Sequence, residues 1–396
     1  MTQKTPFTPH ISKVASAIQP FHVMKILAEA KALETQGQEI IHMEIGEPDF
    51  SSLPCIHQAA NQAVEKGLTH YTPTMGLPAL RKKLAQFYQS FYQAEVSPNH
   101  IMITPGSSTA LQLVLTAILN PGDKVILADP AYPCNRQFVN LLYAELLAIP
   151  VSQETQYQLN LELLKQNWQD GIKAVMVASP SNPTGTVIEQ TELVAMAEFL
   201  AEKNVYLIVD EIYQGLVYDR PAESILANQK LPDNVIVINS FSKFFGMTGW
   251  RLGWTVAPKH LIPILDRLGQ NLFLAAPTPS QYGALRILEK DALDALEQRR
   301  QIFATRRKVL MHAMNDAGFK ITTVPQGAFY LYWDISDFSH DSQQFCSQLL
   351  NETGVAITPG LDFGNFNANT HVRLAYTCDA EKLKKAVKLI EIFVAK

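Results

Sequence analysis

The sequence lacks the features that would place it in several common protein classes. Its four cysteines are scattered and form no Cys-x-x-Cys pair, so neither a disulfide framework nor a thiolate metal site is predicted. No His-Glu-x-x-His arrangement occurs, and we expect no bound metal. No run approaches the roughly 18 apolar residues of a membrane span, and residues 1–10 lack the apolar core of a signal peptide. We therefore expect a cytoplasmic protein.

The chain also lacks an excess of charge of either sign. Its 33 Lys and Arg residues are balanced by 37 Asp and Glu residues, and the net charge of −4 suits neither nucleic acid nor an anionic membrane as a partner. Repeats and Gly/Ser-rich linkers are absent as well. What is present is 396 residues, 47% of them hydrophobic, which is enough for one large domain and a closely packed smaller one.

Short apolar runs recur through the middle of the chain and are typical of strands buried on both faces of a sheet. Helical stretches, such as residues 108–119 and 191–203, separate these runs. This alternation predicts an α/β domain with a mostly parallel, doubly wound sheet. The runs occupy residues 101–104, 124–128, 174–178, 205–209 and 235–238.

A different pattern follows this block. Residues 279–318 are helical and rich in charge, and residues 329–334 form a predicted strand that leads into mixed structure. We divide the chain into an N-terminal arm and helix (1–45), a large domain (46–280) and a small α+β domain (281–396). The amphipathic segment 23–34 is expected to pack on the small domain.

Residues with functional chemistry follow the C-terminal ends of the predicted strands, where open α/β sheets bind ligands. After the run 101–104, the segment Pro105-Gly-Ser-Ser-Thr109 opens a helix. Its free N–H groups, with Ser107 and Ser108, could hold a phosphate. Ordinary helix capping is the alternative explanation for these hydroxyls.

The segment after the run 235–238 is more specific. Lys243 has hydroxyls nearby at Ser240 and Ser242, and Arg251 follows eight residues later among glycines. An amine whose pKa is lowered by its site can form an imine, while hydroxyls and a guanidinium can hold a phosphate. The alternative, a solvated surface lysine, is disfavoured by the strand end and the close glycine spacing.

The pattern Ser-x-Ser-Lys-x-x-Gly-x-x-Gly-Trp-Arg-x-Gly over residues 240–253 resembles that of class I/II aminotransferases, which are fold-type-I, pyridoxal-phosphate-dependent enzymes similar to aspartate aminotransferase. Further motifs match the family in its order and extend the resemblance over nearly the whole chain. They are Gly46-Glu-Pro-Asp-Phe50, Tyr71-Thr-Pro-Thr-Met-Gly76, Asp129-Pro-Ala-Tyr-Pro133, Ser181-Asn-Pro-Thr-Gly185, Asp210-Glu-Ile-Tyr213 and Val372-Arg-Leu374. The resemblance implies a seven-stranded sheet in the large domain.

The resemblance implies that pyridoxal phosphate is the cofactor and assigns most of its binding site. Lys243 would form an imine with the cofactor, and Asp210 would pair with the pyridine nitrogen and keep it protonated. Tyr213 and Asn182 would hydrogen-bond the ring hydroxyl oxygen, and Tyr132 would stack on the ring. Lys243, Asp210 and Tyr213 are the predicted catalytic residues. Taken alone, Asp210 could instead be a helix cap, Asn182 a turn residue and Tyr132 a core tyrosine.

The resemblance also implies how the substrate and a second subunit are bound. Arg373 would clamp the substrate α-carboxylate, with Asn182 and the backbone of Gly46 beside it, although an internal salt bridge is the alternative for a buried arginine. Tyr71 would reach the phosphate held by a neighbouring subunit, which implies a homodimer with shared active sites. The cofactor phosphate would be held by Ser107, Ser108, Ser240, Ser242 and Arg251.

The implied reaction moves an amino group between an L-amino acid and a 2-oxo acid by a ping-pong mechanism, with glutamate and 2-oxoglutarate as one couple. Several dicarboxylate-using relatives have a lysine directly after the glycine-rich phosphate turn, whereas Gly106 of this chain is followed by Ser107, Ser108 and Thr109. The second amino acid therefore stays open among aspartate, aromatic, alanine and branched types. Two alternatives are a carbon–sulfur β-lyase with the same cofactor and a non-catalytic regulator. The regulator is disfavoured because the N-terminal segment is neither long nor basic enough to be the DNA-binding domain expected of it.

Overall fold

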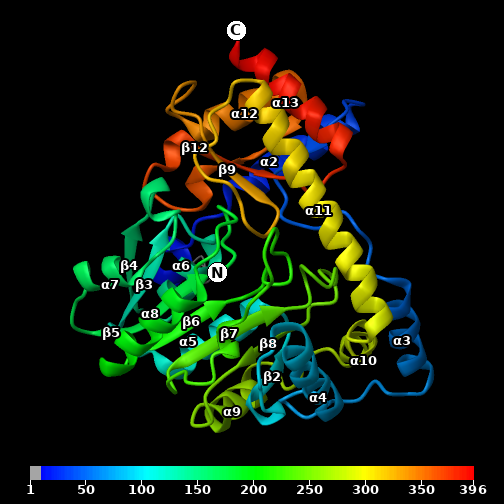
Figure 1. Cartoon of the computed structure of the whole chain (residues 1–396), viewed down its shortest axis with the longest axis vertical. Coiled ribbons are helices and arrows are strands. Elements are labelled where there is room, and N and C mark those ends of the chain that lie inside the picture. Colours follow the sequence, from blue (N-terminus) through cyan, green and yellow to red (C-terminus); the bar gives the residue numbers. More distant parts are fainter. Residues whose placement is uncertain (1–9) are drawn as a thin grey trace, which may run out of the picture.

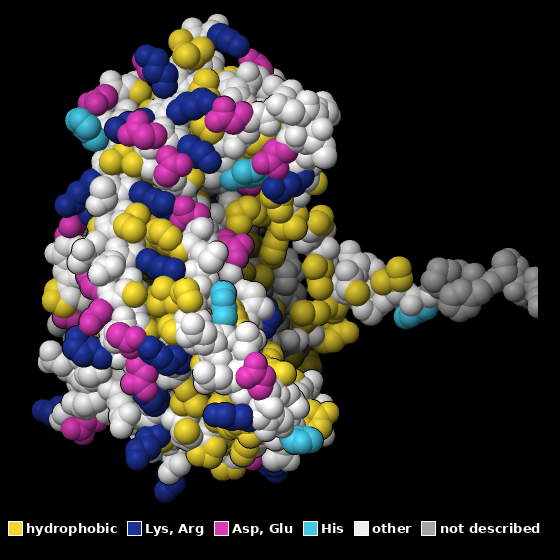
Figure 2. Space-filling view, turned by 90° about the vertical axis from the view of Figure 1, so that its right-hand side faces the viewer, with side chains coloured by type: hydrophobic (Ala, Val, Ile, Leu, Met, Phe, Trp, Pro, Cys, Tyr) yellow, Lys and Arg dark blue, Asp and Glu magenta, His cyan; other side chains and the backbone are white. Residues whose placement is uncertain are grey.

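The computed structural model describes residues 10–396, so residues 1–9 of the polar N-terminal segment lie outside the described residues. Figure 1 shows a large sheet with its helices in the lower part of the molecule and a smaller group of strands and helices above it. The long helix α11 (Lys290–Asp316) runs along one side and reaches both parts. Figure 2 shows hydrophobic side chains gathered where the surface is hollowed, between the two parts.

The large sheet has seven strands in the order β2-β8-β7-β6-β5-β3-β4. β8 runs antiparallel to its neighbours β2 and β7, and all other neighbouring pairs are parallel. The predicted mostly parallel α/β sheet is therefore confirmed. Its strands are β2 (Ile101–Thr104), β3 (Lys124–Asp129), β4 (Glu145–Pro150), β5 (Ile172–Ala178), β6 (Tyr206–Asp210), β7 (Val235–Ser240) and β8 (Gly253–Val256).

All five apolar runs became strands with bounds within two residues of the prediction, whereas β4 and β8 were not located from the sequence. β4 is an edge strand with several partly exposed residues, so it does not form a uniformly apolar run. β8 is four residues long and lies inside the glycine-rich motif, which hid its strand character.

The sheet is buried on both faces because successive side chains of a strand point in opposite directions. Leu207 and Val209 join the hydrophobic cluster on one face, while Ile208 between them joins the cluster on the other. The residues of β7 alternate in the same way. Burial of each side chain of this size contributes roughly 1.5–3 kcal/mol to the free energy of folding. The register of the sheet is therefore fixed, because a shift by one residue would move each side chain to the opposite face.

Helices surround this sheet, and the predicted helices 108–119 and 191–203 correspond to α5 and α8. A short α1 (Lys13–Ala17) precedes the fold. The helices of the large part are α3 (Pro54–Glu65), α4 (Pro78–Phe87), α5 (Ser107–Ile118), α6 (Pro133–Leu141), α7 (Leu161–Gln166), α8 (Gln190–Glu202), α9 (Ile262–Leu272) and α10 (Thr278–Ile287).

The smaller part contains an antiparallel sheet of β9 (Tyr330–Asp334), β12 (His371–Ala375) and β11 (Thr358–Pro359), with β12 in the middle. A parallel pair joins β1 (Ile41–His42) to β10 (Val355–Ala356). Helix α2 (His22–Thr35) packs against α12 (Ser342–Thr353), β10 and β11, and α13 (Ala380–Val394) packs against α11. The domain boundaries at residues 45 and 280 stay predictions, and residue 280 lies within α10.

The topology brings the carboxyl ends of all strands except β8 to one edge of the large sheet. β2 is antiparallel to β8, which is antiparallel to β7, so β2 points in the same direction as the parallel strands. The residues that follow β2, β3, β5, β6 and β7 therefore meet at the carboxyl edge, below the smaller sheet. Across residues 10–396, every helix is too short or too polar to cross a membrane.

Candidate active site

A cavity of about 200 Å³ lies at this carboxyl edge. Its walls come from the segments after the strands of the large sheet, from β12 of the small sheet, and from the start of α2. Nine residues singled out from the sequence line it together, although they are spread over more than 300 positions. They are Gly46, Ser107, Ser108, Tyr132, Asn182, Asp210, Tyr213, Lys243 and Arg373.

Lys243 follows the buried strand β7 and directs its amine into this cavity. Its Nζ donates a hydrogen bond of 2.6 Å to the backbone carbonyl of Gly46. Burial lowers the pKa of the amine to about 8, and the positive charges of Arg373 and Arg251 act in the same direction, while the carboxylate of Glu47 opposes them. The amine is therefore closer to its neutral, nucleophilic form than an ordinary lysine.

Asp210 is the last residue of β6 and is buried in the same cavity. One of its oxygens accepts a hydrogen bond of 3.1 Å from the N–H of Ile212. Burial raises the pKa of the carboxyl to about 7, although that N–H group and the charge of Lys243 favour the ionised form. A positively charged ligand atom beside Asp210 would stabilise its ionised form.

Arg373 lies in the middle of the small sheet, where β12 pairs with both of its neighbours. Its guanidinium donates to Oδ1 of Asn182 at 3.0 Å, to the carbonyl of Glu44 at 2.5 Å and to Oγ1 of Thr358 at 3.2 Å. None of these acceptors is a carboxylate, and the buried Nε has no partner among the described residues. Within residues 10–396, the internal salt bridge considered from the sequence does not form. An anionic ligand would therefore stabilise the buried guanidinium.

Two tyrosines connect the large and small sheets inside the site. The hydroxyl groups of Tyr213 and Tyr330 are 2.7 Å apart, and the guanidinium of Arg373 lies 4.4 Å from the ring centre of Tyr330. Tyr330 also explains Gly46, because a Cβ atom at that position would lie 2.0 Å from the Tyr330 hydroxyl. Tyr330 was missed in the sequence, where it is one aromatic residue within an apolar strand.

The segment after β2 forms the predicted anion cradle. Gly106 precedes α5 with a φ of 85°, and no side chain caps the first turn of the helix, which starts at Ser107. The first N–H groups of α5 have no partner within the helix and can bind an anion. A Cβ atom at Gly106 would lie 2.7 Å from Nη2 of Arg251, so only glycine lets this guanidinium approach the helix start.

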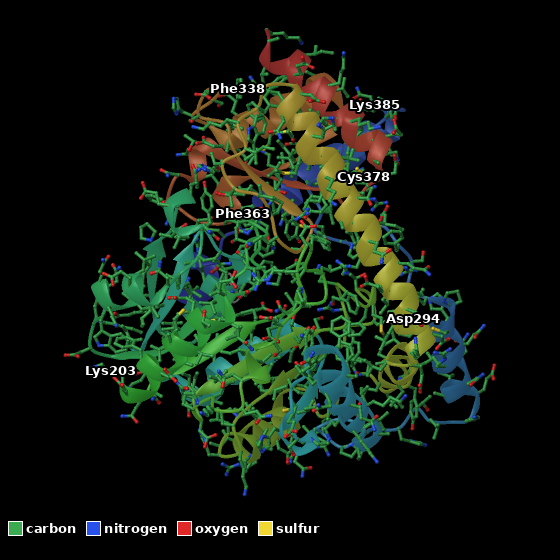
Figure 3. The ribbon with its side chains drawn as sticks, in the orientation of Figure 1. Lys203, Asp294, Phe338, Phe363, Cys378 and Lys385 are labelled. Carbon is green, nitrogen blue, oxygen red and sulfur yellow. The ribbon has the colours of Figure 1, made fainter. Side chains whose placement is uncertain are left out.

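Four of the residues singled out from the sequence do not line the cavity. Ser240 and Ser242 are buried and hydrogen-bonded to each other at 2.9 Å, and Arg251 lies behind Gly106. Tyr71 is 82% exposed and is not among the residues that line the cavity. Conversely, the cavity is also lined by Phe21, Val23 and Phe363, which were not singled out from the sequence. Phe363 lies at the junction of the two parts of the molecule (Figure 3).

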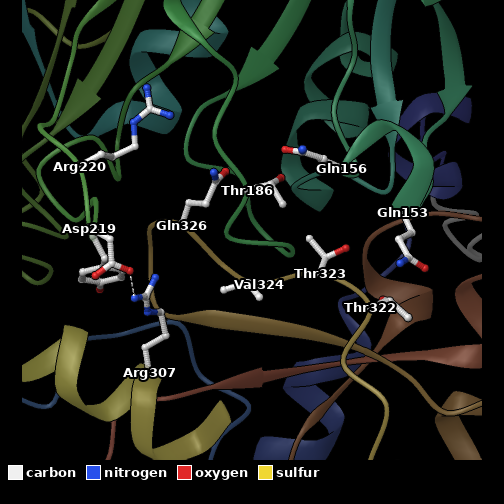
Figure 4. A pocket seen from close by; sticks show the side chains of 11 residues that line it. Gln153, Gln156, Thr186, Asp219, Arg220, Arg307, Thr322, Thr323, Val324 and Gln326 are labelled. Atoms are coloured by element: carbon white, nitrogen blue, oxygen red, sulfur yellow. Dashed lines mark hydrogen bonds and ion pairs between the residues drawn. The ribbon is translucent and has the colours of Figure 1, made fainter. Parts of the chain in front are cut away.

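A second hollow, of about 540 Å³, is lined in part by the loop that leads into β9 (Figure 4). Its charged side chains are already paired, Arg307 with Asp219 and Arg220 with Glu189. The remaining side chains that line it are mostly glutamines and threonines, and it contains no lysine. In the described chain, no group of three or more His, Cys, Asp or Glu side chains could hold a metal ion. The first cavity therefore remains the candidate for chemistry.

Comparisons with known proteins agree with this geometry. The family model for aminotransferase class I and II matches residues 38–390. The chain is 36% identical to the (5-formylfuran-3-yl)methyl phosphate transaminase of Methanocaldococcus jannaschii, over 98% of this chain and 100% of the relative. It is 35% identical to the valine–pyruvate aminotransferase of Mycobacterium tuberculosis, over 95% of this chain and 96% of the relative.

Solved structures of similar proteins extend the agreement to three dimensions. An aminotransferase from Mycobacterium tuberculosis superimposes with a TM-score of 0.94 at 33% identity, covering 98% of this chain and 100% of that one. Aspartate aminotransferase from Thermus thermophilus with maleate gives a TM-score of 0.90 at 31% identity, covering 97% and 100%. The chain therefore belongs to the class I and II aminotransferases, which are pyridoxal-phosphate-dependent enzymes of fold type I.

Proposed function

We propose that this enzyme moves an amino group between an L-amino acid and a 2-oxo acid in a ping-pong cycle, with glutamate and 2-oxoglutarate as one couple. One observation carries the proposal. An amine with a lowered pKa, Lys243, shares a cavity with Arg373, a buried guanidinium that has no carboxylate partner in the described chain. The site therefore combines a base with a binding group for a carboxylate.

The cavity fits pyridoxal phosphate by the chemistry of its groups. The start of α5 with Ser107 and Ser108, supported by Arg251 and the buried pair Ser240 and Ser242, would hold the phosphate. When bound, the cofactor supplies an electron sink for the bonds at the substrate Cα. Ser107 and Ser108 belong to α5 of the large part, whereas Arg373 belongs to β12 of the small sheet.

The other cavity residues would place and tune the ring. Asp210 would pair with the ring nitrogen, and Tyr213 and Asn182 would donate hydrogen bonds to the ring hydroxyl oxygen. Tyr132 would stack on the ring and hold its plane. The hydroxyl of Tyr330, which is hydrogen-bonded to that of Tyr213, would fix the direction of the tyrosine donor.

Lys243 would perform the proton transfers. It would anchor the cofactor covalently and, once released by the substrate amine, take the proton from Cα and deliver it to C4′ of the cofactor. A pKa of about 8 suits a group that must both accept and donate a proton near neutral pH. The carbonyl of Gly46 accepts a hydrogen bond from the amine and would aim it.

Arg373 would bind the substrate α-carboxylate, with Asn182 orienting the guanidinium through its Oδ1. For Gly46, we predicted a backbone contact to the same carboxylate. A carboxylate accepts hydrogen bonds, so the N–H of Gly46 would make this contact, while its carbonyl accepts the hydrogen bond from Lys243.

The first experiment is the ultraviolet–visible spectrum of the purified protein before and after addition of L-glutamate alone. Conversion of the cofactor band to that of the aminated form would support the first half of the reaction. A band that persists with glutamate and every other amino acid donor would contradict it. Release of pyruvate and ammonia from a cystathionine-like substrate would favour the β-lyase, and the Lys243→Ala variant is the control.

We also propose a homodimer in which Tyr71 reaches the neighbouring site. Tyr71 is 82% exposed, and its segment is held in place by a hydrogen bond of 2.8 Å from Thr278 to the carbonyl of His70. Leu272 and Leu274, close in sequence to Thr278, are also exposed, and exposed apolar groups favour an interface. Light scattering of the holoenzyme should give twice the mass of 44.1 kDa. A monomer with full activity would contradict this proposal.

Location and partners stay predictions: we expect a cytoplasmic enzyme that binds small molecules and neither nucleic acid nor membranes. The balanced charge of the chain supports this expectation.

A further inference from the structure

Most of the cavity-lining residues that have no role above are apolar. Among them, Phe21 and Val23 come from the start of α2, and Ile45, Leu111 and Phe363 come from three other segments. These side chains are far apart in the sequence and meet only in the folded protein. Such a wall can accept an uncharged apolar group and offers no hydrogen bond to a polar one.

The charges of the cavity show the same bias. Lys243 and Arg373 are the only cations among its described lining residues, and both have roles in the reaction. The carboxyl groups that line it belong to Glu44, Asp210 and Asp362. Within the described residues of one chain, a second carboxylate on a substrate would therefore be desolvated without a free cation and close to existing acids, which is unfavourable.

The apolar wall is fixed by a contact across the chain. Phe21 occupies the N-cap position of α2, and its side chain cannot cap the helix. Asp362 does so instead, because its carboxylate accepts hydrogen bonds of 2.6 Å from the N–H of His22 and 2.9 Å from that of Val23. Asp362 is itself buried, and this contact joins residues about 340 positions apart.

The same contact is linked to the substrate clamp. Phe363 follows Asp362 directly and lines the cavity, and its ring centre lies 4.9 Å from the guanidinium carbon of Arg373. The wall and the binding group for the α-carboxylate are thus held by one short segment. A shift of Asp362 would move the apolar wall relative to the bound substrate.

We propose that Asp362 is a positioning residue that holds the first turn of α2 over the cavity, and that the resulting wall selects amino acids with an uncharged, apolar side chain as the partner of glutamate. The proposal rests on the aminotransferase function proposed above. It identifies the class of the second substrate, which the sequence leaves open.

The test of selectivity uses three amino acids of nearly equal shape. L-leucine, L-asparagine and L-aspartate differ at Cγ by two methyl groups, an amide and a carboxylate, so the series separates size from polarity and charge. With the holoenzyme and 2-oxoglutarate, we expect kcat/KM for leucine to exceed that for aspartate by at least about tenfold, with asparagine between them. Equal or better use of aspartate would overturn the proposal, including the case in which a partner subunit supplies a cation.

An absence of turnover with every amino acid would contradict the aminotransferase function itself, and the inference with it. This outcome differs visibly from turnover that favours aspartate. The same spectra used to follow the cofactor band would separate the two failures.

The role of Asp362 is tested with Asp362→Asn and a matched control. Asp379 caps α13 in the same way, through a hydrogen bond of 3.0 Å from the N–H of Lys382, but it lies away from the cavity. In Asp362→Asn, the ratio of kcat/KM for leucine to that for alanine should fall by at least about fivefold, through KM for leucine. Asp379→Asn should leave the ratio unchanged.

If the role of Asp362 is purely structural, kcat/KM for leucine and for alanine would fall together and their ratio would stay constant. That result would overturn the assignment. Phe21→Ala removes the wall without touching the cap and provides an independent variant if Asp362→Asn fails to fold. It should lower the same ratio, and an unchanged ratio in Phe21→Ala would also overturn the proposal.

Discussion

The lowered pKa of Lys243 leads to a prediction about how fast the cofactor-free protein binds pyridoxal phosphate covalently. Only the neutral amine attacks an aldehyde. With a pKa of about 8, about one amine in ten is neutral at pH 7, compared with about one in 2,500 for an ordinary lysine with a pKa near 10.4. Burial favours the neutral form, so the rate should rise with pH, reach half of its maximum near pH 8 and level off above about pH 9.

The assay mixes cofactor-free protein with pyridoxal phosphate at a series of pH values and follows the growth of the imine absorbance. Nα-acetyl-lysine, whose ε-amine is free, is measured under the same conditions and corrects for ionisation of the cofactor itself. At pH 7, the neutral fraction of the Lys243 amine should be about 250 times that of the lysine derivative. A corrected rate that reaches half of its maximum near pH 10 would refute the reasoning, since it would show that burial does not perturb this amine.

Three further predictions concern single side chains. Asp210→Asn should lower kcat/KM at least a hundredfold, about 3 kcal/mol, because a buried ion pair with the cofactor nitrogen would be lost, and steady-state kinetics would show it. Arg373→Lys should raise KM for amino acids more than it lowers kcat, because an ammonium cannot form the two parallel hydrogen bonds of a guanidinium. Gly106→Ala should weaken cofactor binding, measured by titration of the cofactor-free protein, because Cβ would press against Arg251 and φ is 85°.

Much of the large sheet could be predicted from the sequence because its central strands are buried on both faces. Runs such as residues 235–238 are continuously apolar for that reason, and their C-terminal ends indicated where polar groups would gather. The edge strand β4 has no such constraint, since part of it faces solvent. Its residues therefore carry no pattern that a single sequence reveals.

The same reasoning explains which cavity residues were found. Lys243, Asp210 and Arg373 are charged residues at the ends or in the middle of apolar runs, so each stands out against its neighbours. Phe21 and Tyr330 are aromatic residues in contexts where any core side chain would fit. Their place in the site depends on contacts between distant segments, such as Asp362 with the start of α2, and only the folded chain supplies them.

The two perturbed groups of the site express one physical constraint. Burial disfavours charge on both Lys243 and Asp210, which lowers the pKa of the amine to about 8 and raises that of the acid to about 7. Near neutral pH, the site thus combines two groups whose ionisation is disfavoured by burial with a guanidinium, Arg373, that has no carboxylate partner among residues 10–396. A ligand that brings a protonated ring nitrogen to Asp210 and a carboxylate to Arg373 compensates both costs together. The shifted pKa values of these groups and their fit to a protonated ring nitrogen and a carboxylate therefore have the same origin, which is the depth at which the fold places these side chains.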